Sequence, residues 1–289
     1  MKIRKSFIGG LILVFVAVGF GFGLDWPQEE KGPDSIVSFF GQNIGGKISK
    51  SIIFTDPAQV NAIKDGTLLI VMSDVDDDSD FFPSSLGSCV ILSHDDDMIS
   101  VYANLDEDSI NLKKNSYTEG ELIGETGNSG WQQTRSSLEF QMLDNQKSAA
   151  INPKILLPRI ENEKDYNLSG IMLQNKEGKF FDIKETKIFP SGTYKIYHTR
   201  NKTIVPYKTT CTINGVIIDE ICFDTINMLN GRLYIDGSTK QYTADILYPD
   251  QNLILTGEVM FPSGQSTLGI TVENYLGKTK QISYILSIY

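Results

Sequence analysis

Histidine, which often catalyses reactions and binds metal ions, is rare in this 289-residue sequence, which contains two, His94 and His198. His94 ends an apolar stretch just before the acidic turn at residues 95–97, and His198 alternates with Tyr194 and Ile196 in an expected strand. The two histidines fall in segments that we expect to form different domains. We therefore interpret both as structural residues, with His198 partly buried.

The densest group of carboxylates is the acidic run at residues 74–80, which resembles the start of a calcium-binding loop. Ser79 and Ser85 stand at the positions where an EF-hand needs glycine and a bidentate glutamate. We expect a solvated hairpin tip whose like charges repel one another.

Three cysteines, Cys89, Cys211 and Cys222, add little reactive chemistry. Cys89 lies in an apolar stretch and is expected to pack as a small hydrophobic residue. The other two flank Asn214 and Gly215, a pair typical of two-residue hairpin turns. In such a hairpin Ile218 would lie opposite Cys211, so a disulfide needs another register or a third strand. The sequence leaves both the disulfide and the free thiols open.

Residues 47–155 contain landmarks in a characteristic order: a turn, two apolar strands, a glycine-rich run and a last strand. The landmarks are PAQVNAIKDG at residues 57–66, CVILSH and VYANL at 89–94 and 101–105, YTEGELIGETGNSG at 117–130, and SLEFQ at 137–141. This order and spacing resembles the M23 family of zinc peptidases of the bacterial cell wall, also called LytM-like peptidases. The resemblance implies an antiparallel β-sheet domain with a substrate groove.

The same resemblance identifies the positions at which the family carries metal-binding and proton-transferring side chains. Lys47 and Ser51 stand at the family's first histidine and aspartate, and Asn104 stands at a catalytic histidine. Ser137 and Glu139 replace the two histidines of the last strand. The family's chemistry is therefore expected to be missing from a scaffold that is otherwise retained.

A catalytic zinc ion needs three protein ligands, and these residues supply one carboxylate, that of Glu139. An ammonium group offers no lone pair, and zinc rarely selects a neutral hydroxyl. Neither Asn104 nor Ser137 titrates in the range that a general base requires. We expect no cofactor, no metal and no catalytic residue. The five positions would then line a degenerate groove, with residues 128–133 at its rim and Lys47 paired with Glu139.

The remaining sequence completes an all-β organisation in two domains. We expect a leader at residues 24–34, the M23/LytM-like domain at 35–158, a polar linker at 159–168 and a second domain at 169–289. Strand patterns recur in the second domain, where Leu268, Ile270 and Val272 share one face. Two apolar sheet faces bury against each other in a β-sandwich. The last hairpin resembles that of bacterial immunoglobulin-like domains.

The N-terminus has the layout of a secretory signal, with a basic start followed by an uncharged apolar run at residues 7–24. Gly21 and Gly23 suit a cleavage site before Leu24. The length of the run leaves an uncleaved membrane anchor open. We expect export to the periplasm or cell envelope.

Removing residues 1–23 takes away three basic side chains and changes the net charge from −10 to −13, since 23 basic residues then face 36 acidic ones. An acidic chain of this kind is unsuited to nucleic acid or to an anionic membrane surface.

Two classes of function compete at this point. One is a non-catalytic envelope protein that uses the degenerate groove to bind peptidoglycan, or to scaffold or regulate a cell-wall hydrolase, as degenerate relatives of the family do. The other is a metallopeptidase with a rebuilt site, for example Glu139 with His94. A purely structural envelope component is a third reading.

Overall fold

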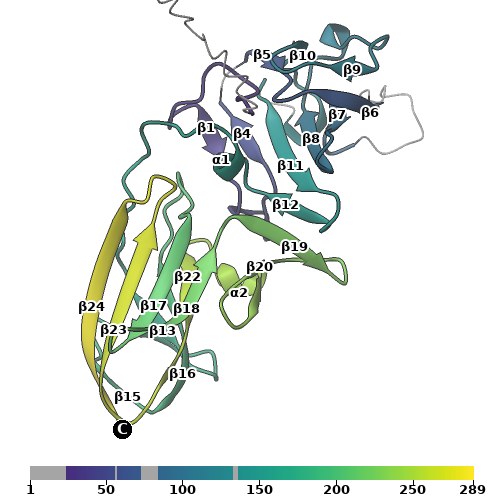
Figure 1. Ribbon diagram of the computed structural model, residues 1–289. Coiled ribbons are helices and arrows are strands. Elements are labelled where there is room, and N and C mark those ends of the chain that lie inside the picture. The colour runs from purple at the N-terminus through teal and green to yellow at the C-terminus, as the bar shows by residue number, and fades with distance from the viewer. Residues whose placement is uncertain (1–23, 56, 73–83, 133–135) are drawn as a thin grey trace, which may run out of the picture.

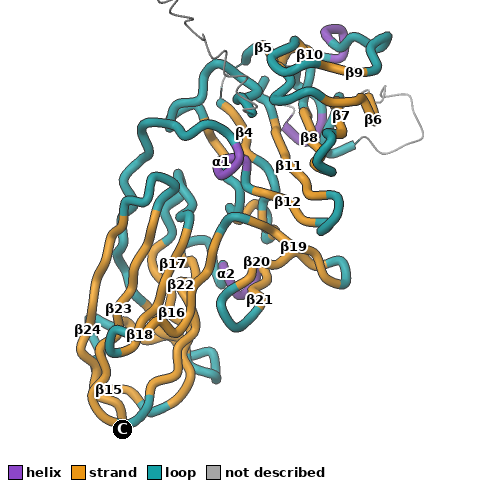
Figure 2. Tube along the Cα trace, viewed as in Figure 1, coloured by secondary structure: helices purple, strands orange, loops and turns teal. Residues whose placement is uncertain are grey.

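The computed structural model describes residues 24–55, 57–72, 84–132 and 136–289 and consists mainly of antiparallel β-strands in two domains (Figure 1, Figure 2). The predicted all-β fold class is confirmed. The expected signal segment at residues 1–23 and the acidic run at 74–80 lie outside the described residues. Within the described residues, no helix has both the length and the apolar character needed to cross a bilayer.

The first domain is a twisted antiparallel sheet in the order β6, β7, β8, β11 and β12, with β4 joined to the start of β11. Its strands are β1 (Ile36–Ser38), β2 (Asn43–Ile44), β3 (Lys47–Ile48), β4 (Ile52–Phe54), β5 (Gln59–Asn61), β6 (Gly66–Met72), β7 (Cys89–Ser93), β8 (Met98–Ala103), β9 (Ser116–Tyr117), β10 (Leu122–Glu125), β11 (Glu139–Asp144) and β12 (Ala149–Ile151). Its short helices are η1 (Glu107–Ser109), η2 (Gly130–Gln132) and α1 (Pro153–Leu156).

A row of directly opposed side chains forms the centre of this domain's core. Val90 lies opposite Tyr102, Tyr102 opposite Phe140, and Phe140 opposite Ile52, and all four are buried. Because side chains alternate across a strand, the neighbouring residues in sequence project from the opposite face. Each such burial stabilises the fold by roughly 1.5–3 kcal/mol. The core therefore fixes which residues of β8 and β11 face the groove.

The second domain packs two sheets face to face, as the alternating apolar pattern predicts. One sheet has the order β14, β13, β16, β22 and the other the order β15, β24, β23, β17, β18. The strands are β13 (Met172–Gln174), β14 (Phe180–Asp182), β15 (Ile188–Phe189), β16 (Gly192–Thr199), β17 (Lys208–Ile213), β18 (Val216–Cys222), β22 (Leu253–Phe261), β23 (Gly264–Glu273) and β24 (Thr279–Ile288). Leu268, Ile270 and Val272 are buried, which confirms their predicted shared face.

The predicted hairpin at Asn214 and Gly215 joins β17 to β18, and both turn residues have positive φ, 50° and 82°. The residue opposite Cys211 is Asp219 rather than the expected Ile218, because a bulge between Cys211 and Thr212 shifts the register by one residue. All three cysteines are free thiols, so the structure resolves the open question against a disulfide.

A segment between β18 and β22 leaves the sandwich and extends the sheet of the first domain. It contains β19 (Thr225–Leu229), β20 (Arg232–Asp236), β21 (Gln241–Thr243) and the short helix α2 (Ala244–Leu247). β19 pairs with β12, so that Ala150 lies opposite Ile226 and the sheet runs on through β20 and β21 (Figure 2). One sheet therefore crosses from the first domain to the second.

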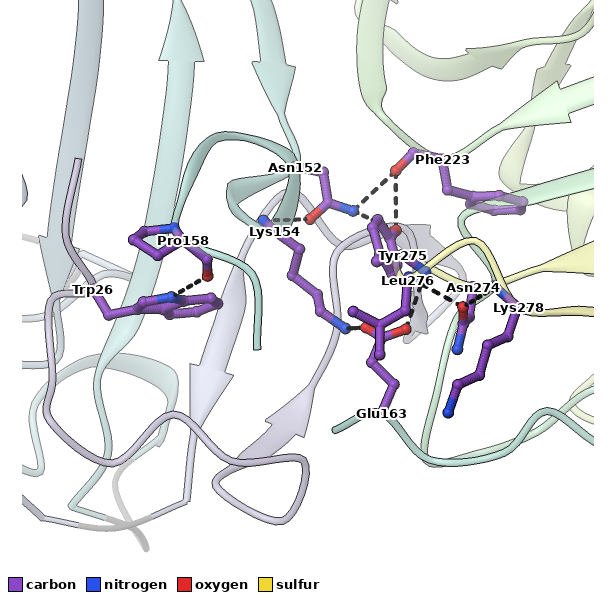
Figure 3. Close-up of polar contacts among 10 residues, drawn as sticks. All are labelled: Trp26, Asn152, Lys154, Pro158, Glu163, Phe223, Asn274, Tyr275, Leu276 and Lys278. Atoms are coloured by element: carbon purple, nitrogen blue, oxygen red, sulfur yellow. Dashed lines mark hydrogen bonds and ion pairs between the residues drawn. The ribbon is translucent and has the colours of Figure 1, made fainter. Parts of the chain in front are cut away.

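Polar contacts also connect the two domains at this junction, around Asn152 and Lys154. Asn152 precedes α1, and its Nδ2 atom donates to the backbone oxygen of Phe223 at 2.9 Å and to the Tyr275 hydroxyl at 2.6 Å. Figure 3 shows these contacts together with the ion pair of Lys154 and Glu163, whose side chains are 13% and 8% exposed. Glu163 also accepts from the Tyr275 backbone N–H at 3.0 Å.

The segments expected as leader and linker contribute to this packing. Trp26 is buried, and its Nε1 atom donates to the Pro158 carbonyl at 2.7 Å. Tyr166, within residues 159–168, is buried and shares a hydrogen bond with His198. The Tyr248 hydroxyl donates to the Gly41 carbonyl across the junction at 2.5 Å. The two domains thus share a continuous core.

Candidate functional site

The strand register brings most of the predicted site residues together on one face of the first domain's sheet. Glu139 lies opposite Ala103 on one side and Ile53 on the other, and Asn104 follows directly after Ala103. Ser137 stands two residues before Glu139, so the alternation of the chain directs it to the same side. The Asn104 Nδ2 atom donates to the Ser137 carbonyl at 2.6 Å.

The backbone around Asn104 explains why a residue of this type suits the position. Asn104 has φ of 63°, in the left-handed region that asparagine tolerates better than most residues. Its backbone N–H donates to the Leu86 carbonyl at 2.9 Å, and its carbonyl accepts from Gly127 at 2.7 Å. The side chain is buried. Asn104 therefore connects the end of β8 to the glycine-rich run.

Glu139 is only 6% exposed, and its carboxylate accepts hydrogen bonds from side chains of the described residues. Trp131 Nε1 donates to one carboxylate oxygen at 2.7 Å, and Gln141 Nε2 donates to the other at 3.2 Å. Trp131 lies in η2, where its backbone N–H donates to the Ser85 carbonyl at 3.2 Å. The ring is 52% exposed, so it presents an aromatic surface directly beside the buried carboxylate.

Ser51 and Lys47 occupy different surroundings. Ser51 is buried before β4, and its hydroxyl lies 3.3 Å from that of Ser49. Lys47 is exposed in β3, which pairs with its hairpin neighbour β2. Across the parts of the chain that the structure describes, no ion pair joins Lys47 to Glu139, so the expected pairing is wrong.

Both histidines are engaged in structural hydrogen bonds, as predicted. The His94 ring is buried, with Nδ1 2.7 Å from the Asp65 carbonyl and Nε2 2.8 Å from the Ser100 hydroxyl. His198 is fully buried rather than partly buried, because Tyr166 covers it from outside the sandwich. Burial lowers the pKa of His198 to about 3. Neither ring reaches the site with a free nitrogen.

The donors needed for a metal site are not gathered here. Among residues 24–55, 57–72, 84–132 and 136–289, no group of three or more His, Cys, Asp or Glu side chains is placed to hold a metal ion. The five predicted positions supply one carboxylate, one ammonium, one amide and two hydroxyls. Such a set does not fit a zinc ion, which needs three basic ligands.

The surface next to Asn104 is hollowed and polar. A pocket of about 420 Å³ lies beside it, lined among others by Ser88, Asp106, Thr126, Asn128 and Ser136. These hydroxyl, amide and carboxylate groups can form hydrogen bonds to a bound ligand. Part of the predicted rim, residues 128–132, borders the site through Asn128 and Trp131, whereas residue 133 lies outside the described residues.

Sequence reasoning did not identify Trp131 and Gln141 as the partners of Glu139. Gln141 had a usable signal, because residues two apart in a strand share a face. For Trp131 the sequence held no such signal, since a hydrogen bond from a turn to a strand produces no periodic pattern of residues.

Comparison with known proteins is consistent with this geometry. A family model described as Peptidase family M23 matches residues 49–153, and a second model, which has no descriptive name, matches residues 165–289. An uncharacterized protein of Treponema pallidum (strain Nichols) is 29% identical over 138 residues, covering 44% of this chain and 92% of that protein.

Two solved structures are also similar. A chain of the SpoIIIAH and SpoIIQ complex has a TM-score of 0.37 at 18% identity, over 47% of this chain and 100% of that chain. Lysostaphin has a TM-score of 0.37 at 18% identity, over 89% of this chain and 95% of that chain. Residues 49–153 therefore match the M23 peptidase family, and a second β-sheet domain follows them.

Proposed function

We propose that the M23 domain of this chain is non-catalytic and serves in the cell envelope as a binding module. Its degenerate groove would hold either peptidoglycan or a cell-wall hydrolase that the protein scaffolds or regulates. The observation that carries this proposal is the hydrogen bonding of the Glu139 carboxylate. The carboxylate at a family metal position is satisfied by hydrogen bonds from Trp131 and Gln141.

The chemistry of the other four positions supports the same conclusion. A zinc-bound water becomes a nucleophile because the metal lowers its pKa, and the residues at Lys47, Ser51 and Glu139 do not supply the ligands for that metal. Asn104 donates its amide hydrogens to a carbonyl and cannot accept a proton from water. No step of peptide hydrolysis follows from these side chains.

A rebuilt site using His94 is disfavoured by the hydrogen bonds of that ring. One nitrogen is bonded to the Asp65 carbonyl and the other to the Ser100 hydroxyl. A carbonyl can only accept, so Nδ1 carries the proton and donates to Asp65, while Nε2 accepts from the hydroxyl. Recruiting either nitrogen for catalysis would leave a buried polar group without its partner, at a cost of about 1–3 kcal/mol.

The retained scaffold supports binding as the remaining use of the groove. The half-exposed Trp131 beside Glu139 offers an aromatic face, and the hydroxyl and amide groups of the 420 Å³ pocket next to Asn104 offer hydrogen bonds. Aromatic rings pack against sugar and peptide surfaces while their polar atoms stay bonded to the protein. The predicted export of the chain would bring this surface to the cell wall.

The proposal is tested by co-sedimentation with purified peptidoglycan sacculi and by a hydrolysis assay with added zinc. We expect wild-type protein to release no peptide at any zinc concentration. If the wall is the ligand, Glu139→Gln combined with Trp131→Ala will reduce co-sedimentation at least tenfold. A matched control, Lys280→Ala with Glu185→Gln on the second domain, will sediment like the wild type.

Zinc-dependent hydrolysis would refute the non-catalytic assignment. Sedimentation that is equal for wild type and the groove variant would refute the groove as the wall-binding surface. If the wild type does not sediment with sacculi, peptidoglycan is excluded as the ligand, and a cell-wall hydrolase is the remaining candidate.

A further inference from the structure

The face that carries Glu139 does not end with the first domain. Glu139, Gln141 and Leu143 alternate along β11 and therefore project from one face. Leu143 lies opposite Ala150 in β12, and Ala150 lies opposite Ile226 in β19. The groove face thus continues across the domain boundary onto a strand of the second domain.

An apolar pocket of about 220 Å³ lies where the two domains meet on this face. Its apolar lining comes from both domains: Ile99, Leu143, Ala150, Ile226, Met228 and Leu233. Met228 and Leu233 are opposed in the hairpin of β19 and β20, and Met228 is 58% exposed. Apolar cavities of about 150 Å³ hold a benzene molecule, so this pocket accommodates one bulky apolar side chain.

The pocket lies within reach of a ligand that occupies the candidate site. Leu143 follows Glu139 by four positions in β11, which corresponds to roughly 13 Å at about 3.3 Å per residue. Lys50, on the rim of the pocket, directly precedes Ser51 of the site. An extended peptide of about five residues spans the two.

The charges at the rim favour an acidic group beside that side chain. Asp144 is compensated by Lys147, with an N–O distance of 3.6 Å and a further bond from the Lys147 backbone at 2.9 Å. Lys50 is exposed and forms no ion pair with any residue of the described chain. Its ammonium group is therefore available to a carboxylate of a ligand.

We propose that this junction pocket binds a bulky apolar side chain, next to an acidic residue, on an extended segment of a protein partner. The inference rests on the proposed binding function of the groove and selects between its two ligands. Wall peptides consist mainly of alanine, acidic and diamino residues, none of which fills an apolar pocket of about 220 Å³. The second domain would then be part of the recognition surface.

The test is selection of peptides from a random twelve-residue phage library on the purified protein, followed by fluorescence anisotropy with the enriched peptides. We expect a consensus with Phe, Leu, Ile or Met beside Asp or Glu. Met228→Glu should weaken binding at least tenfold. Leu229→Glu is the matched control, because Leu229 is 53% exposed on the same hairpin but does not line the pocket.

Lys50→Glu should also weaken binding, and substituting the acidic residue of the peptide by lysine should restore affinity for that variant. Peptides that bind wild type and Met228→Glu equally, a consensus without an apolar residue, or a failure of any peptide to enrich would overturn the proposal. Sacculus binding that depends on Glu139 and Trp131 but is unchanged in Met228→Glu would leave the groove function standing and refute the junction pocket alone.

Discussion

The ion pair of Lys154 and Glu163 at the domain junction provides a stringent test of how the fold is held together. Both side chains are nearly buried, and burial lowers the pKa of Lys154 despite the neighbouring carboxylate. Glu163→Gln keeps an acceptor for the Tyr275 N–H but leaves the Lys154 ammonium without a counter-charge. Breaking a buried pair in this way costs about 3–5 kcal/mol.

The double variant Lys154→Met with Glu163→Gln removes both charges and should recover most of that loss, because a buried pair exchanged for uncharged groups is often close to neutral. We expect a coupling free energy of at least ~2 kcal/mol in the double-mutant cycle. Single substitution should lower the unfolding midpoint by roughly 6–20 °C, because a loss of about 3–5 kcal/mol acts at about 2–4 °C per kcal/mol.

The assay is thermal and urea unfolding followed by circular dichroism and by tryptophan fluorescence, to which the buried Trp26 and the half-exposed Trp131 both contribute. The exposed pair Lys64 and Asp96, with an N–O distance of 2.6 Å, is the control, and its cycle should give less than about 1 kcal/mol. If the Lys154 and Glu163 substitutions proved additive, the pair would contribute no more than a surface contact and the reasoning would fail.

Three further predictions concern other sites. The folded pKa of His198, about 3, lies below its unfolded value. The free energy of unfolding should therefore fall as the pH drops from 6.5 toward 3, by about 2 kcal/mol at pH 5. In urea titrations at several pH values, His198→Gln should lack this contribution to the pH dependence of stability. Burial raises the pKa of the Cys211 thiol, so iodoacetamide at pH 8 should leave this thiol unmodified until the protein unfolds. Mass spectrometry detects the modification, and rapid labelling of the folded protein would contradict the burial of Cys211. Gly41 has φ of 80°, and a Cβ atom at this position would lie 2.8 Å from the Phe223 ring. Gly41→Ala should therefore destabilise the protein by about 1–3 kcal/mol. An unchanged midpoint of urea unfolding would show that the junction is loosely packed.

The sequence was informative where structure depends on local spacing. Glycine-rich turns and alternating apolar residues predict the all-β fold, the buried face of β23 and the hairpin at Asn214 and Gly215. The landmarks also indicated the M23 domain, which the family match supports. Local chemistry likewise predicted the structural roles of His94 and His198.

Features that depend on long-range pairing were not predictable from one sequence. The contact of β12 with β19 joins Ala150 to Ile226, which share no periodic pattern. The prediction of an ion pair between Lys47 and Glu139 was wrong, because the position of a residue in a motif does not specify the direction of its side chain. The carboxylate instead accepts from Trp131, a residue of a short turn.

The pairing of β12 with β19 also determines how the molecule responds to mechanical load. Where a flexible linker joins two domains, they reorient freely, and a force on one acts on the other only through the point at which the linker is attached. Here a force on the sandwich is transmitted through backbone hydrogen bonds into the sheet that carries Glu139. Tension applied to the second domain would therefore distort the sheet that carries Glu139, so the strand pairing makes this junction a direct mechanical link between the two domains.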